Sequence, residues 1–179
     1  MSDDLNSVES AAPISDLEIA RRQIVFARDY TLTLLEDVAD DEWFMIPSGM
    51  HTNFAWQVGH LAMAEYGLCL FRVRGRQSVD MELMSSAFRK KYSRGSTPDS
   101  DPGNNPSPTE LRSTFDAVHR QSLEEMATYR EENLQEPIDM PYAVFPNKLG
   151  ALYFCASHEM LHAGQIGMLR RAFGKSPVR

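Results

Sequence analysis

The sequence predicts an all-α protein, a four-helix bundle with one long crossover. Four long segments carry apolar residues at three- and four-residue steps, and no segment shows the alternation of a convincing strand. An irregular stretch over residues 92–108, rich in proline-containing turns, separates the second helix from the third. Such a connection lets the second and third helices run parallel, while shorter loops suit antiparallel neighbours.

Residues that favour helix starts and stops mark the limits of each predicted helix. The long helices are predicted over residues 16–39, 54–74, 108–132 and 148–173, with a weak amphipathic helix over 81–90. N-cap or capping-box residues precede the long helices, and glycine- or proline-containing stretches follow them. The second helix is expected to direct an apolar face toward the core, made of Phe54, Val58, Leu61, Leu68 and Phe71.

Composition narrows the class of protein. The 179 residues suffice for one domain with a real core, and the net charge of −7 argues against nucleic acid or an anionic membrane as partner. No apolar stretch approaches the roughly 20 residues of a membrane span. Residues 1–13 lack the features of a secretory signal and are predicted to be a flexible tail before a domain over 14–179. Cys69 and Cys155 are expected to be buried, reduced thiols in a cytoplasmic protein.

The most informative motif is an H-E-x-x-H sequence, His158-Glu159-Met160-Leu161-His162. Residues four apart share one face of a helix, so these two imidazoles can bind one divalent metal. Zinc proteases use the same motif, with the glutamate as general base. Their extended form needs a glycine and a further histidine where this chain has Gln165 and Met168. A third protein ligand therefore has to come from earlier in the chain.

His60 is the candidate for that ligand. It lies mid-helix in an apolar setting, Val58-Gly59-His60-Leu61-Ala62. Three histidines from two helices, with an open fourth position, are typical of a catalytic zinc site. A lone mid-helix histidine is also common as a hydrogen-bonded core or surface residue, so the spacing leaves both roles open. His51 and His119 are expected in a turn and at the surface or rim.

Three further residues near the motif are candidates. Glu159 lies about 100° round the helix from His158, so we expect it to accept a hydrogen bond beside the site, or to act structurally, rather than as general base. Gln165 and Cys155 lie three residues beyond His162 and three before His158, and therefore share the ligand face. Glu159 and Gln165 are the candidates for a catalytic role.

Several stretches resemble the DinB/YfiT-like superfamily. Residues 53–62 resemble its second-helix motif, and residues 158–171 its last-helix motif, H-x-x-x-H-x-G-Q-I with a Leu-Arg-Arg end. Residues 88–98 resemble its short central segment. The resemblance implies an up-down-down-up four-helix bundle, often homodimeric, with a divalent metal, typically nickel or zinc. The metal ligands that it implies are His60, His158 and His162.

The resemblance also bears on function. Characterised members include thiol-dependent S-transferases and a thiol-dependent maleylpyruvate isomerase, which implies a metal-activated thiolate, a low-molecular-weight thiol and a small-molecule substrate. One alternative is a hydrolase that uses metal-bound water with Glu159 as base. Another is a stress protein that binds a metal or small ligand without turnover. A metalloprotease ranks last, because no downstream ligand exists. An open coordination position and an apolar cleft would favour catalysis.

Overall fold

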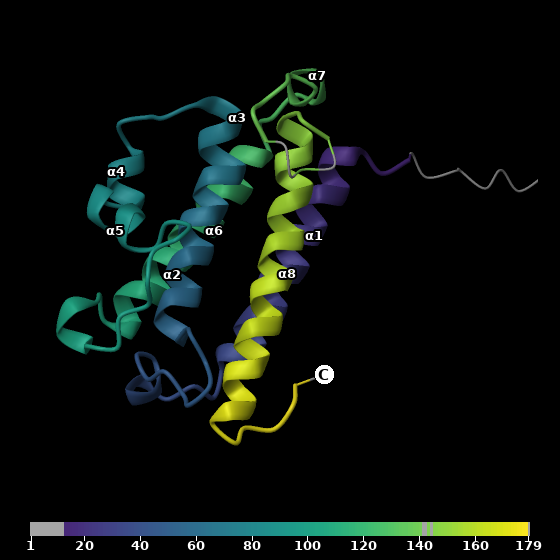
Figure 1. The fold of residues 1–179 in the computed structure, drawn as a ribbon. Helices are drawn as coiled ribbons and strands as arrows, with labels where there is room; N and C mark the ends of the chain where they lie inside the picture. The colour runs from purple at the N-terminus through teal and green to yellow at the C-terminus, as the bar shows by residue number, and fades with distance from the viewer. Residues whose placement is uncertain (1–12, 141–142, 144, 179) are drawn as a thin grey trace, which may run out of the picture.

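The computed structural model describes residues 13–140, 143 and 145–178, and these residues form a helical bundle. Its long helices are α1 (Asp16–Leu35), α2 (Phe54–Glu65), α6 (Pro108–Met126) and α8 (Lys148–Ala172). Figure 1 shows α1 and α8 running in one direction and α2 and α6 in the other. The described residues contain no strand, only an isolated bridge between Pro137 and Asn147. The predicted all-α bundle is confirmed.

Short elements connect the long helices. They are η1 (Asp40–Glu42), η2 (Tyr66–Phe71), α3 (Arg72–Arg74), α4 (Asp80–Leu83), α5 (Ser86–Lys91), η3 (Pro102–Asn104) and α7 (Glu131–Leu134). The predicted helix over 81–90 is therefore two helices, because Met84 between them is extended, with φ −157° and ψ 120°.

Two long helices end earlier than predicted. The helix expected over 16–39 stops at Leu35, where the chain turns and Val38 N donates to the carbonyl of Leu35 at 3.3 Å. The helix expected over 108–132 stops at Met126. Extended backbone at Arg130, with φ −97° and ψ 130°, separates it from α7.

The second long helix contains a π-turn. α2 continues directly into η2, a π-helix, and then into α3, which stops at Gly75 with φ 83°. The predicted extent of this helix is correct, but its regularity is not. A π-turn holds one residue more than an α-turn, so the residues after it are rotated by about 100°. Phe71, expected in the core, is consequently 45% exposed.

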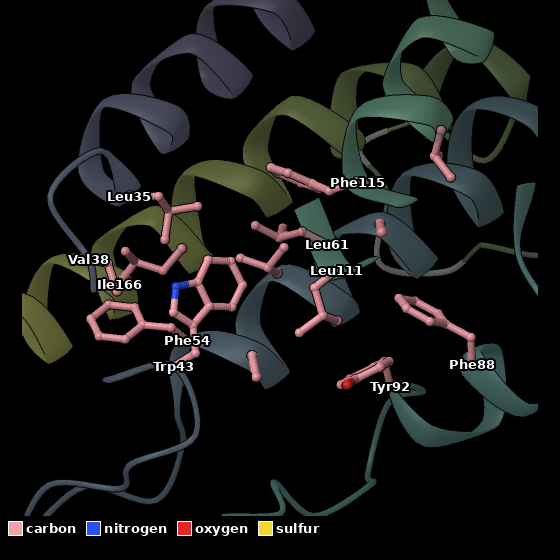
Figure 2. Close-up of a cluster of buried hydrophobic side chains, with 14 of the residues drawn as sticks. Leu35, Val38, Trp43, Phe54, Leu61, Phe88, Tyr92, Leu111, Phe115 and Ile166 are labelled. Carbon is pink, nitrogen blue, oxygen red and sulfur yellow. The ribbon is translucent and has the colours of Figure 1, made fainter. Parts of the chain in front are cut away.

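The core lies between two packed helix pairs, α1 along α8 and α2 along α6. Figure 2 shows one cluster of buried side chains, in which Trp43, from the loop after α1, lies beside Phe54 and Ile166. A second cluster extends along α1 and α8 and contains Cys69 and Cys155, both free and buried as predicted.

Two expectations concern the ends and surroundings of the chain. The tail predicted over 1–13 falls, apart from Pro13, outside the described residues, so it stays a prediction. Among the residues that are described, no helix combines the length and the apolar character needed to cross a membrane.

Candidate metal centre

Three histidines converge between α2 and α8. His60 comes from α2, and His158 and His162 lie one turn apart on α8. One ring nitrogen from each lies within 4.8 Å of the other two. Their ring centroids are 4.5 to 5.3 Å apart. The structure thus brings together the three histidines singled out in the sequence.

The hydrogen bond of His60 sets its tautomer. Its Nδ1 lies 2.8 Å from the backbone carbonyl of Tyr92, which can only accept a hydrogen bond. Nδ1 of the neutral ring therefore carries the proton, and Nε2 keeps its lone pair. The indole of Trp56 stacks on the His60 ring, with ring centroids 4.7 Å apart and an interplanar angle of 6°. Both contacts fix the direction of the imidazole.

A glutamine orients His162 in the same way. Nδ1 of His162 lies 2.6 Å from Oε1 of Gln57. The amide of Gln57 is itself fixed, because its Nε2 donates to Thr52 Oγ1 and to Gln165 Oε1, both at 2.9 Å. Its oxygen thus faces the imidazole and accepts, which leaves Nε2 of His162 unprotonated. Partners of this kind are the usual means of aligning metal-ligating histidines.

Burial keeps the cluster uncharged. Loss of hydration lowers the pKa of His60 despite its hydrogen bond to Tyr92. Burial and then repulsion from His60 lower the pKa of His158 to about 4. Burial and repulsion from His158 and His60 lower that of His162 to about 3. At neutral pH all three rings are therefore neutral, the form that binds metal.

These donors fit a divalent cation. Bonds of about 2.0–2.1 Å in a tetrahedral site place ligand nitrogens about 3.4 Å apart. The histidine nitrogens would therefore have to approach one another by about 1 Å to bind a metal. Neutral imidazoles suit zinc, nickel, copper and iron alike, so the donor set leaves the metal's identity open.

A close contact between α2 and the chain that follows α5 makes the site possible. A Cβ at Gly59 would lie 2.5 Å from Cγ and Cδ1 of the Tyr92 ring. Only glycine lets Tyr92 pack this near to α2, and this packing brings its carbonyl to the next residue, His60. Gly59 is thus explained by the ring that lies against it.

The histidines line a pocket of about 670 Å³. Trp56 and Phe154 flank them, and Ser93, Arg94 and Gly95 of the crossover contribute another part of the wall. A second pocket, of about 430 Å³, shares Trp56 and includes His51, Gln165 and Met168. A cavity of several hundred Å³ is the usual size for a small-molecule site.

The other candidate residues occupy different places. Gln165 lines the second pocket and accepts from Gln57, whereas Cys155 is buried and lies outside both linings. His51 is exposed, as expected of a turn residue. His119, expected at the surface or rim, is instead only 15% exposed in its side chain, and its Nδ1 lies 2.8 Å from Oε1 of Glu65.

Glu159 belongs to a buried ion network rather than to the pocket lining. Arg28 Nε donates to Glu159 Oε1 at 2.9 Å, Nη2 donates to Glu65 Oε2 at 2.6 Å, and Nη1 donates to the Phe115 carbonyl at 3.0 Å. Burial raises the pKa of Glu159. In Glu65, attraction to Arg28 and the hydrogen bond with His119 outweigh burial and lower the pKa.

This network joins all four long helices at the level of the histidines. Arg28 lies on α1, Glu65 on α2, Phe115 on α6 and Glu159 on α8. Since Glu159 adjoins His158 and Glu65 lies five residues after His60, the network fixes the two ligand-bearing helices relative to each other. Sequence reasoning missed it, although the place of Arg28 beside Ala27 and four residues after Ile24, on the apolar stripe of this helix, was an available signal.

The fold and the site together define the class of protein. It is a four-helix bundle in which three neutral imidazoles from two helices form a candidate metal centre. The chain belongs to the DinB superfamily, which matches it over residues 23–166. That range contains His60, His158 and His162, so the resemblance noted in the sequence is confirmed at the level of the family. No curated protein matches the chain.

Proposed function

We propose that the protein is a divalent-metal-dependent enzyme that attaches a low-molecular-weight thiol, through its sulfur, to a small electrophile. The observation that carries the proposal is the place of the histidines, which offer unprotonated nitrogens in the wall of a pocket of about 670 Å³. A structural zinc site is closed by four protein ligands, whereas a catalytic site keeps a position open. Only three candidate ligands meet here among the described residues.

The residues have separable roles in this proposal. His60, His158 and His162 hold the cation, zinc or nickel. The Tyr92 carbonyl and Gln57 hold two of the rings in direction. A cation bound there lowers the pKa of a thiol and so supplies a thiolate at neutral pH. Trp56 and Phe154 exclude water from one side of the pocket.

Atoms and electrons balance in this transfer without a further reagent. The thiol proton passes to solvent, the thiolate sulfur forms a bond to the electrophilic carbon, and the leaving group departs with the electrons of the bond that breaks. No oxidant or reductant is required.

The position of Glu159 counts against the hydrolase alternative. A general base has to reach the attacking water, directly or through one further water. The Glu159 carboxylate instead accepts from Arg28 and lies outside the pocket lining. A stress protein that binds a small ligand without turnover would also use a pocket of about 670 Å³, so turnover in the conjugation assay distinguishes the two. The homodimer and the cytoplasmic location stay predictions from the sequence.

Metal analysis followed by a thiol-conjugation assay tests the proposal. The purified protein is expected to bind one zinc or nickel ion per chain and to conjugate cysteine or glutathione to an aromatic halide. His60→Ala should abolish both, while His51→Ala, an exposed histidine outside the cluster, should bind metal normally. Glu159→Gln with retained metal should spare transfer. Lack of metal in the wild-type protein would refute the proposal.

A further inference from the structure

The pocket beside the histidines extends along α2 and its continuation. Its wall on this helix includes Trp56, His60, Met63, Gly67, Leu68 and Arg72. Apart from the adjacent pair Gly67 and Leu68, these positions recur at three- and four-residue steps, as one face of a helix requires. Arg72 follows His60 by 12 residues, about 18 Å at about 1.5 Å per residue. The pocket therefore has a histidine end and a distant end.

The π-turn places Arg72 on this wall. In an uninterrupted α-helix, at about 100° per residue, position 71 would lie about 20° from His60 and position 72 about 120° away. Because η2 contains one extra residue, the position that faces the same way as His60 shifts from 71 to 72. Arg72 therefore faces the pocket, and Phe71 is turned outward, 45% exposed. A π-turn inside a helix frequently marks a functional site.

A second guanidinium comes from the crossover. Arg94 lines the same pocket between Ser93 and Gly95. No aspartate or glutamate is among the described residues of the lining, although the chain holds 25 acidic against 18 basic residues. The pocket is thus a basic site in an acidic protein. Between the histidines and Arg72, the lining includes the apolar side chains of Met63, Leu68 and Phe154. Arg94 lies nearer the histidine end, because Tyr92, two residues before it, contacts His60, and Ser96, two residues after it, contacts Trp56.

We infer that this pocket binds an elongated small molecule with an anionic group at the end away from the histidines. Arg72 binds this anion, Met63, Leu68 and Phe154 contact an apolar body, and Arg94 adds positive charge nearer the histidines. Guanidinium groups match carboxylate and phosphate geometry with paired hydrogen bonds. The inference deepens the proposed function, on which it rests for the reacting end, by naming the class of substrate or thiol.

Binding of matched thiols to the zinc-loaded protein tests the inference. The probes are 8-mercaptooctanoate and its uncharged amide, 8-mercaptooctanamide, which share the thiol and the chain. Calorimetry is expected to give the acid at least about tenfold higher affinity, because a hydrogen bond to a charged group is stronger than a neutral one. Added salt should narrow the difference. Equal affinities would overturn the inference.

Variants locate the anion. Arg72→Gln is expected to lower the affinity for the acid about tenfold and to leave that for the amide unchanged. Arg72→Lys, which keeps the charge, should restore part of it. Arg94→Gln, nearer the histidines, should lower the affinity for the acid by less. Arg120→Gln, an exposed arginine of α6 outside the pocket, is the matched control. If Arg72→Gln weakens acid and amide alike, Arg72 does not bind the anion.

Arg72 is partly buried, so a thermal melt of each variant accompanies the titrations. If Arg72→Gln does not fold, the comparison of acid with amide on the wild-type protein still tests the inference.

A metal-free arm separates this inference from the proposed function. Octanoate and octyl phosphate are each compared with octanamide on protein stripped of metal, which tells a carboxylate from a phosphate. Tighter binding of either anion supports the inference even if zinc never binds and the proposed function fails. Zinc binding and thiol transfer, together with no preference for an anion, would refute the inference alone.

Discussion

Replacing Gly59 with alanine tests whether its contact with Tyr92 orients His60. The added Cβ would lie 2.5 Å from Cγ and Cδ1 of the Tyr92 ring and 2.7 Å from Cδ2, closer than the 3.0 Å that real Cβ atoms respect. Tyr92 is 1% exposed and packs on Phe88 with ring centroids 4.7 Å apart. The ring therefore has no free space to move into, and any shift also displaces the carbonyl that accepts from His60.

Two opposing effects determine how much Gly59→Ala changes the free energy of unfolding. Alanine is favoured over glycine inside a helix by about 1 kcal/mol. Overpacking of a filled core costs about 1–3 kcal/mol. Gly164→Ala on α8 is the matched control, because a Cβ there meets nothing within 4 Å, and it should stabilise the protein by about 1 kcal/mol. The two variants should therefore differ by about 1–3 kcal/mol.

Urea unfolding of the metal-free variants measures this difference, and competition with a chromophoric chelator measures zinc affinity. Displacing the acceptor of a ligating histidine typically costs about 10- to 100-fold in metal affinity. Tyr92→Leu, which removes the obstructing ring, should relieve part of the cost in a double mutant. If Gly59→Ala matches Gly164→Ala in stability and wild type in zinc affinity, the contact does not orient His60.

Three further substitutions have defined outcomes. Burial would raise the pKa of Asp80, but hydrogen bonds, first from Arg74, outweigh it and lower the pKa to about 2. A depressed folded pKa stabilises above the unfolded value, so Asp80→Asn should cost about 2 kcal/mol at pH 7. In urea unfolding, that difference should disappear as the pH falls from about 4 toward 2. Gln57→Leu removes the acceptor of His162 and should weaken zinc binding at least about tenfold in the chelator competition; unchanged affinity would contradict this role. Arg28→Met leaves two buried glutamates without their cation and should cost about 3–5 kcal/mol in urea unfolding, whereas a loss below about 1 kcal/mol would show that the network is not needed.

Features encoded within a few residues were predictable from the sequence. Capping residues were expected before the long helices, and the structure has them: Ser107 and Glu110 form a capping box, and Asn53 and Asn147 cap α2 and α8 through their side chains. The pairing of His158 with His162 follows from helical spacing alone. Bringing His60 to them needed the family resemblance, because spacing says nothing about which helices are neighbours.

Features that depend on the tertiary structure were not predictable. A backbone carbonyl orients His60, and no residue type in the sequence signals such a partner. The Arg28 network draws on four helices far apart in the sequence. No residue pattern signalled the π-turn, and it turned an expected core residue, Phe71, toward solvent. Short-range patterns thus specified the long helices and where they begin, while contacts between helices decided what each face meets.

The attachment of the crossover limits how its length can vary. Surface loops ordinarily tolerate insertions. Here Tyr92 accepts from His60, Ser96 Oγ accepts from Trp56 Nε1 at 2.9 Å, and the Asp99 carbonyl accepts from Asn53 Nδ2 at 3.0 Å. An epitope tag spliced in before Asp99 would therefore perturb the histidine cluster from a distance. The exposed tip over 102–104 offers a safer point of attachment for a label.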